Sequence, residues 1–130
     1  MSSSGAWTVI RPAELEFTPP SKGDPTRGVM RLSEHLSRSR ANVWRMPPSS
    51  RGRRHLETRQ EEVFVCLEGT ATLHLGEPPV AIELTPGTVA LVKPRTPVQL
   101  ANDRPSDGIV LVLGAPPTVG DAEYLPDTSA

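Results

Sequence analysis

The sequence predicts an all-β fold, a barrel or sandwich of short strands. Fifteen prolines and ten glycines interrupt the 130-residue chain and leave room only for short segments between turns. Apolar and β-branched segments recur between these turn residues at intervals of roughly 8–12 residues, which is typical of sandwiches and barrels. The sequence contains neither a βαβ rhythm nor a glycine-rich phosphate loop. The predicted fold class is therefore all-β.

The expected elements begin with an extended, proline-rich segment that holds one strand at 7–10. Residues 31–39 form at most a short helical turn, which Ser33 could cap. The strongest strand is expected at 63–67, because this segment is rich in β-branched and apolar residues. Further strands are expected at 41–46, 53–57, 70–75, 80–84, 88–92, 98–101 and 109–113.

These elements predict a division of the chain into three parts. Residues 1–40 form an N-terminal arm, residues 41–114 form the barrel, and residues 115–130 form a C-terminal tail. The tail is rich in proline, aspartate and serine, so we expect it to pack loosely.

Composition excludes several classes of protein. The net charge is −1, and no stacking aromatic residues interleave with the arginines, so we expect no nucleic-acid partner. No apolar run approaches the roughly 20 residues that a membrane span needs. The N-terminus lacks a basic region followed by an apolar run. The single cysteine, Cys66, cannot form an internal disulfide and is expected to be buried. We therefore expect a cytoplasmic protein without a membrane partner.

Seven arginines crowd one stretch of the chain, and two interpretations of them remain open. They could bind a phosphate or carboxylate ligand. They could instead form a solvated or dimer-edge face paired with Glu57, Glu61 and Glu68. The seven are Arg38, Arg40, Arg45, Arg51, Arg53, Arg54 and Arg59.

Two neighbouring strands carry polar side chains on one face each. Residues two apart on a strand share a face, so Arg53, His55 and Glu57 point the same way. On the next strand, Glu62 and Phe64 do the same. If both faces look into a barrel, one imidazole and two carboxylates converge there.

With this spacing the sequence resembles the cupin family, in its small single-domain form. The first motif of that family is Gly, five residues, His-x-His, three or four residues, Glu, six residues, Gly. The sequence keeps the spacing, and the corresponding residues are Ser49, His55, Glu57, Glu62 and Gly69.

The second cupin motif is Gly, five residues, Pro-x-Gly, two residues, His, three residues, Asn. Its spacing is also kept, and the final position is Asn102. Lys93 and Arg95 replace the proline and second glycine, and Val98 stands where the histidine belongs. The resemblance covers roughly residues 41–114 and implies a double-stranded β-helix, the cupin or jelly-roll barrel.

The resemblance implies an altered metal site. Metal-binding cupins use His, His, Glu and His, whereas this chain offers His55, Glu57 and Glu62, and Val98 cannot be a ligand. One nitrogen with carboxylate oxygens suits Mn²⁺ or Fe²⁺ better than a structural zinc, with Ni²⁺ and Zn²⁺ as further candidates.

Two metal-free alternatives stay open at this point. A hydrogen-bond network in which Arg53 or Arg59 joins His55 and the two glutamates would satisfy the carboxylates without metal. The same carboxylate pair could instead share a proton and, beside the imidazole, provide an acid and a base for catalysis.

Three functions follow from these alternatives, and the fold alone does not separate them. The first is a protein that binds a small molecule in the barrel and whose metal site is altered or absent. The second is an enzyme with His55 and Glu62 as catalytic candidates, either a metal-dependent oxygenase or isomerase or a metal-free cyclase or epimerase. The third is a structural or regulatory protein. Barrels of this kind expose sheet edges, so we also expect a homodimer. The predicted pocket is lined by Arg53, His55, Glu57, Glu62, Phe64, Val98 and Leu100.

Overall fold

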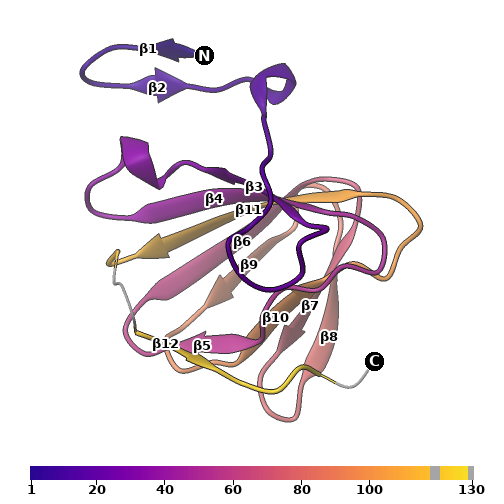
Figure 1. The fold of residues 1–130 in the computed structure, drawn as a ribbon. Coiled ribbons are helices and arrows are strands. Elements are labelled where there is room, and N and C mark those ends of the chain that lie inside the picture. The colour runs from indigo at the N-terminus through magenta and orange to yellow at the C-terminus, as the bar shows by residue number, and fades with distance from the viewer. Residues whose placement is uncertain (118–120, 129–130) are drawn as a thin grey trace.

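Two five-stranded sheets form the body of the protein (Figure 1). The structure is a computed structural model, and it describes residues 1–117 and 121–128. All strand pairs within the two sheets are antiparallel. The predicted all-β fold class is confirmed.

The first sheet is built around an apolar central strand, β11. Its order is β3-β4-β11-β6-β9, and its central strand β11 pairs with β4 on one side and with β6 on the other. The strands are β3 (Gly28–Arg31), β4 (Arg40–Met46), β11 (Gly108–Ala115), β6 (Glu61–Glu68) and β9 (Val89–Val92).

The second sheet faces the first across the core. Its order is β12-β5-β10-β7-β8, so β5, which carries His55 and Glu57, lies next to β10, which carries Val98. The strands are β12 (Ala122–Tyr124), β5 (His55–Glu57), β10 (Val98–Ala101), β7 (Ala71–Leu75) and β8 (Val80–Leu84).

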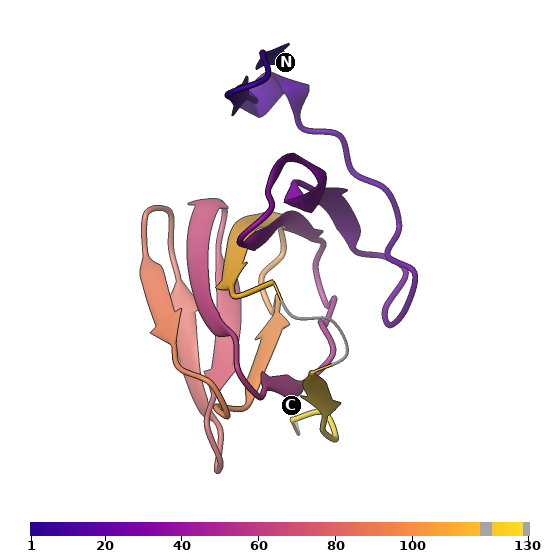
Figure 2. The same ribbon diagram turned by 90° about the vertical axis from the view of Figure 1, so that its left-hand side faces the viewer.

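The N-terminal residues lie outside the two sheets. Strands β1 (Ser2–Ser3) and β2 (Thr8–Val9) form a small hairpin that stands apart from the barrel (Figure 2). Short 3₁₀ turns follow at η1 (Pro12–Glu14) and η2 (Ser33–His35). Within residues 1–117 and 121–128, no helix is long and apolar enough to cross a membrane.

Two edge strands were missed by the sequence prediction. Strand β3 lies inside the expected arm and pairs with β4, and β12 lies in the tail, where Tyr124 is opposite His55. The expectation of a loosely packed tail is therefore wrong for Ala122–Tyr124. Neither segment shows strong apolar alternation, and each becomes a strand because a neighbour offers a free edge for hydrogen bonding. The helical turn expected at 31–39 shrinks to Ser33–His35.

The hydrophobic core fills the space between the sheets. Met46, Leu73, Leu84 and Val110 are fully buried there, because alternate residues of each strand point inward. Cys66 is buried and unpaired, as the sequence predicts.

Backbone conformation supports the alignment with the two cupin motifs. Among the described residues, Ser49 (φ 66°) and Arg95 (φ 67°) are the non-glycine residues in the left-handed region. Both stand where the motifs carry glycine, the residue that adopts this conformation without steric cost. Gly69, which the chain retains, also has positive φ, and a Cβ there would clash with the Asp107 carbonyl. The turns of the family are therefore kept even where the glycine is not.

Candidate functional site

A cavity of about 440 Å³ opens at one end of the barrel. Strands β4 and β6 of one sheet and β5, β10 and β12 of the other form its walls, and the loop before β3 borders it. The structure places all seven residues of the predicted pocket on these walls, and they are Arg53, His55, Glu57, Glu62, Phe64, Val98 and Leu100.

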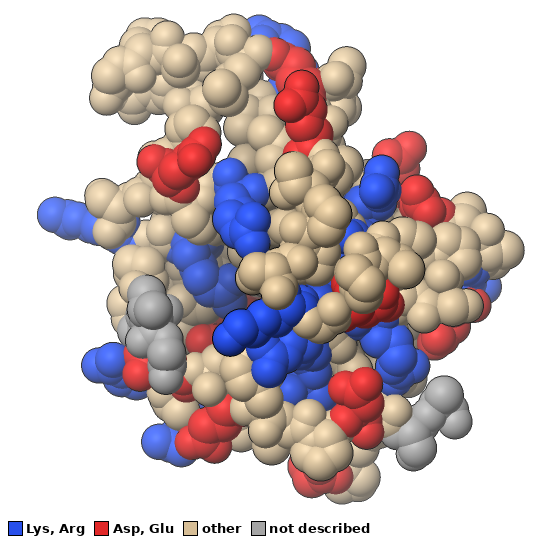
Figure 3. All heavy atoms as spheres, in the orientation of Figure 1, with Lys and Arg blue, Asp and Glu red and all other residues tan. Residues whose placement is uncertain are grey.

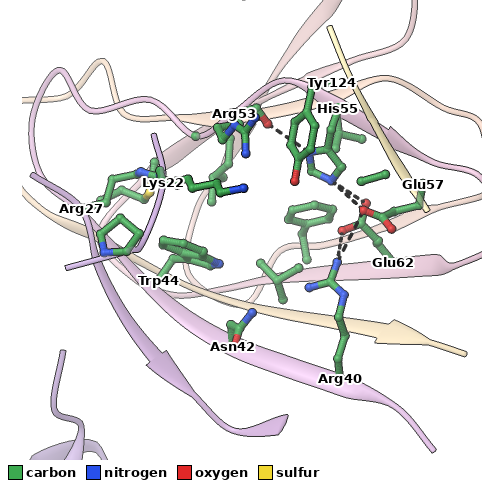
Figure 4. Close-up of a pocket in the computed structure, with 18 of the residues that line it drawn as sticks. Lys22, Arg27, Arg40, Asn42, Trp44, Arg53, His55, Glu57, Glu62 and Tyr124 are labelled. Carbon is green, nitrogen blue, oxygen red and sulfur yellow. Dashed lines mark hydrogen bonds and ion pairs between the residues drawn. The ribbon is translucent and has the colours of Figure 1, made fainter. Parts of the chain in front are cut away.

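Three of these residues form a compact polar group. Strand β5 carries His55 and Glu57, and strand β6 of the facing sheet carries Glu62 (Figure 4). The Nε2 atom of His55 lies 3.3 Å from Oε2 of Glu57 and 3.6 Å from Oε1 of Glu62. One nitrogen and two carboxylates therefore converge, as the strand alternation predicts.

Arg40 closes this group from strand β4. Its Nη2 atom donates to Oε2 of Glu62 at 2.9 Å and lies 4.0 Å from Oε2 of Glu57. Its Nε atom donates to Oε1 of the buried Gln60 at 2.5 Å, which fixes the guanidinium. We call His55, Glu57, Glu62 and Arg40 the acid–histidine cluster.

The arginine in this cluster differs from those that the sequence hypothesis named. Arg59 instead pairs with Asp121 at 2.7 Å, and Arg53 stacks on the ring of Tyr124. Arg40 shares a face of strand β4 with Asn42 and Trp44, and all three side chains line the cavity. The seven-arginine stretch thus divides, and only Arg40 of that stretch pairs with Glu57.

Burial and charge act in opposite directions on His55. Burial alone would lower its pKa, but the hydrogen bond to Glu62, the charges of Glu62 and Glu57 and the Arg53 carbonyl together raise it above 6.5. Its Nδ1 atom donates to the Arg53 carbonyl at 3.0 Å, so Nε2 faces the carboxylates. When His55 is protonated, it and Arg40 balance the charges of the two glutamates.

Glu57 is held differently from its partner. Burial raises the pKa of Glu57, and the nearby charges of His55 and Arg40 only partly oppose this effect. The side chain is 8% exposed and lies on the cavity wall. It is therefore a carboxyl group that a ligand in the cavity can reach.

The same donor set fits a divalent metal ion. The three donor atoms of His55, Glu57 and Glu62 all lie within 4.8 Å of one another. The hydrogen bond from Nδ1 to a backbone carbonyl orients the ring, an arrangement usual for metal-bound histidines. Val98 is fully buried and lies opposite His55 in the sheet, so the missing fourth ligand is replaced by an apolar wall.

The other end of the cavity is basic and aromatic, and sequence reasoning found only part of it. Arg27 lies over the ring of Trp44, with 4.6 Å from Cζ to the centroid. Arg53 lies 3.5 Å over the ring of Tyr124. Lys22, Arg27 and Tyr124 come from a loop and from the tail, where no periodic pattern indicates which way a side chain points.

Comparison with known proteins agrees with the barrel and with its motifs. Residues 42–114 match the sequence profile of the Cupin_2 family, the cupin domain. A search of curated proteins finds no match.

Several solved structures are similar to the chain in fold. A conserved protein with a double-stranded β-helix domain from Klebsiella pneumoniae has a TM-score of 0.68 and 23% identity, covering 85% of this chain and 92% of that one. A sugar phosphate isomerase of the cupin superfamily from Silicibacter pomeroyi has a TM-score of 0.70 and 21% identity, covering 83% and 75%. The polyketide cyclase RemF from Streptomyces resistomycificus has a TM-score of 0.76 and 14% identity, covering 94% and 87%.

These identities are too low to transfer an activity, but the family profile covers more than half of the sequence. The predicted double-stranded β-helix is confirmed, and the chain belongs to the Cupin_2 family of cupin domains.

Proposed function

We propose that the protein binds a small organic molecule in the barrel cavity, against the acid–histidine cluster. One observation carries the proposal: a cavity of about 440 Å³ onto which ionisable side chains of two facing sheets converge. Ligand sites in proteins commonly enclose roughly 300–1,000 Å³ and combine apolar walls with a few polar groups. Here Phe64, Val98 and Leu100 supply apolar wall beside the cluster.

A divalent metal ion, Mn²⁺, Fe²⁺, Ni²⁺ or Zn²⁺, is a proposed cofactor of the same site. His55, Glu57 and Glu62 would hold it, and a bound ion would act as a Lewis acid on a ligand oxygen. Arg40 competes with such an ion, because its charge already neutralises Glu62 at 2.9 Å. We therefore expect weaker metal binding than at a site with four protein ligands.

Proton transfer is the second candidate function, and the contact between His55 and Glu57 favours it. Their side chains form a donor–acceptor pair 3.3 Å apart on the cavity wall, within reach of a bound molecule. Such a pair suits an isomerase, epimerase or cyclase, and a sugar phosphate isomerase and a polyketide cyclase share this fold. His55 and Glu62 stay the catalytic candidates, with Glu57 beside them.

A ligand screen tests the binding proposal. Thermal shift and calorimetry with small metabolites compare wild type with Asn42→Trp, which fills the cavity, and with Val80→Trp on the outside. We expect compounds that bind wild type and Val80→Trp but not Asn42→Trp. Equal binding by all three proteins, or no binding by wild type, would contradict the proposal. Parallel elemental analysis of protein purified without chelator measures bound metal.

We also propose a homodimer and a cytoplasmic location. The dimer is supported by edge strand β9, whose Val89 and Leu91 side chains are 53% and 78% exposed and would be covered by a second copy. Light scattering should give twice the chain mass of 14.0 kDa and a smaller mass for Leu91→Lys. A monomer at micromolar concentration contradicts the dimer.

A further inference from the structure

The end of the cavity opposite the acid–histidine cluster carries more positive charge than its surroundings neutralise. Five lysine and arginine residues line the cavity, against three acidic residues. In Figure 3, basic side chains gather in the middle of the face that is shown. Arg40 pairs with Glu62, whereas Lys22 and Arg27 lie across the cavity from that pair, and Arg53 lies beside Tyr124, between them and His55 (Figure 4). We call Lys22, Arg27 and Arg53 the cationic end.

The chain holds two of these cations in defined positions. Arg27 is only 6% exposed, donates to the carbonyls of Lys22 and Asp24 at 3.0 and 3.1 Å, and lies over Trp44. Gly23 (φ +80°) packs so tightly that a Cβ there would lie 2.7 Å from Nη2 of Arg27 and 3.0 Å from Cγ of Arg53. Both guanidinium groups are therefore preorganised by the loop and by an aromatic ring.

No carboxylate among the described residues forms a close ion pair with the cationic end. Within residues 1–117 and 121–128, no carboxylate lies within 4.0 Å of the side-chain nitrogens of Lys22, Arg27 or Arg53. Asp24 attracts Arg27 from beyond 4.0 Å, but its oxygens accept from Thr26 and from the Arg51 amide. Asp121, which also lines the cavity, pairs with Arg59.

A buried charge is normally paired, because removing it from water costs free energy that only an opposite charge and hydrogen bonds recover. Arg27 has stacking and two carbonyl acceptors, which satisfy some of its N–H groups, and its charge is compensated only in part, by Asp24 beyond 4.0 Å. Guanidinium groups fixed in plane by aromatic rings present N–H edges that match carboxylate and phosphate oxygens. A negatively charged group of a molecule bound in the cavity would balance this positive charge.

We infer that the cationic end seats an oxyanion group, a carboxylate or phosphate, of the small organic ligand. The inference rests on the proposed function and adds the chemical class and the orientation of the ligand. The oxyanion lies against Arg27, Arg53 and Lys22, and the remainder of the molecule extends toward Glu57 and His55. The rings of Trp44 and Tyr124 line the cavity and favour a flat ligand body.

Trp44 provides a direct readout of this end. The chain has two tryptophans, and Trp7 is 63% exposed on the separate hairpin, so Trp7→Phe leaves Trp44 as the sole tryptophan reporter. In this background, fluorescence titrations use benzoate, phenyl phosphate and the neutral benzyl alcohol as probes. Arg27→Met and Arg53→Met remove cations of the site, and Arg38→Met removes an exposed arginine elsewhere. Thermal unfolding midpoints show whether each variant folds. If Arg27→Met does not fold, Arg53→Met alone tests the inference.

We expect saturable binding of at least one anion, at least tenfold tighter than that of benzyl alcohol. Each cation-removing variant should weaken it at least tenfold, and Arg38→Met should leave it unchanged. The tighter anion identifies the headgroup as carboxylate or phosphate. Equal affinity for benzyl alcohol, anion affinity unchanged in both variants, or no binding of any probe overturns the oxyanion seat. The ligand screen with Asn42→Trp then decides separately whether the cavity binds other molecules.

Discussion

The two ends of the cavity are both highly charged, but they handle their charge in opposite ways. At the acid–histidine cluster, Arg40 and His55 lie 2.9–3.6 Å from the carboxylates that they approach most closely. At the cationic end, Arg27 and Arg53 stack on aromatic rings, and no described carboxylate lies within 4.0 Å of them. The charges of the acid–histidine cluster are balanced within the protein, whereas the cationic end keeps a net positive charge that a bound anion can balance.

This difference separates stability from binding. Where charges neutralise each other inside the protein, removing one of them destabilises the fold, because its partner stays buried and unpaired. Charges without a protein partner contribute little to folding and are available to a ligand. We therefore expect substitutions at the acid–histidine cluster to reduce stability, and substitutions at the cationic end to reduce affinity.

The largest expected effect is loss of stability in Glu62→Ala. Glu62 is 3% exposed, and its removal leaves Arg40 without its nearest carboxylate, so unfolding should become easier by about 3 kcal/mol. Urea denaturation measures the change. Glu61→Ala, exposed on the same strand, is the matched control and should change stability by less than about 0.5 kcal/mol. Equal effects of the two substitutions would remove the distinction between the ends.

The two ends also differ in how far sequence predicts them. His55, Glu57 and Glu62 sit on regular strands, so alternation and motif spacing place them correctly. Strand 98–101 was predicted with the bounds that the structure shows. Lys22 and Arg27 reach the cavity from a loop whose path depends on tertiary contacts such as that between Arg27 and Trp44. A single sequence carries no local signal for such a contact.

Metal affinity should rise in Val98→His. Val98 lines the cavity and is the cross-strand neighbour of His55. Metal-binding cupins carry their second-motif histidine at this position, so Val98→His would add a fourth donor to the three present. We expect divalent metal affinity to increase by roughly tenfold to a hundredfold, measured by calorimetry with Mn²⁺, Ni²⁺ and Zn²⁺.

Val98→Leu serves as the control for this substitution and should not gain affinity. An unchanged affinity in Val98→His would show that the donor atoms of the acid–histidine cluster do not converge on an ion. Val98→His should change the benzoate affinity of the cationic end by a smaller factor than it changes the metal affinity.

An effect of intermediate size is expected in the pH dependence of the stability that His55 contributes. Because the pKa of His55 is raised in the folded protein, its stabilising contribution is complete below 6.5 and is lost as pH rises through the folded-state value. In chelator-treated protein, the stability difference between wild type and His55→Asn should therefore shrink from pH 6.5 upward. Urea denaturation across pH 5–9 measures it. A difference that grows with pH would mean that His55 folds as the neutral imidazole.

The smallest expected effect is a gain of stability in Arg95→Gly. Arg95 adopts φ 67°, and its amide donates to the Glu57 carbonyl at 2.7 Å. This hydrogen bond holds the backbone of Glu57, a member of the acid–histidine cluster. Glycine keeps this hydrogen bond and relieves the left-handed strain, although it adds freedom to the unfolded chain. We expect about 0.5–1 kcal/mol of stabilisation by urea denaturation. A loss of stability would mean that the Arg95 side chain contributes more than its conformation costs.

The most direct test makes the same substitution at both ends. Arg40→Met and Arg53→Met each remove one guanidinium group, and both variants are measured for free energy of unfolding and for benzoate affinity. Arg40→Met should lose about 3 kcal/mol of stability, because Glu62 stays buried without its partner. Arg53→Met should change stability by less than about 1 kcal/mol and weaken benzoate at least tenfold. Similar losses of stability in both variants, with benzoate affinity unchanged in Arg53→Met, would contradict the division between a self-neutralised end and an anion-binding end.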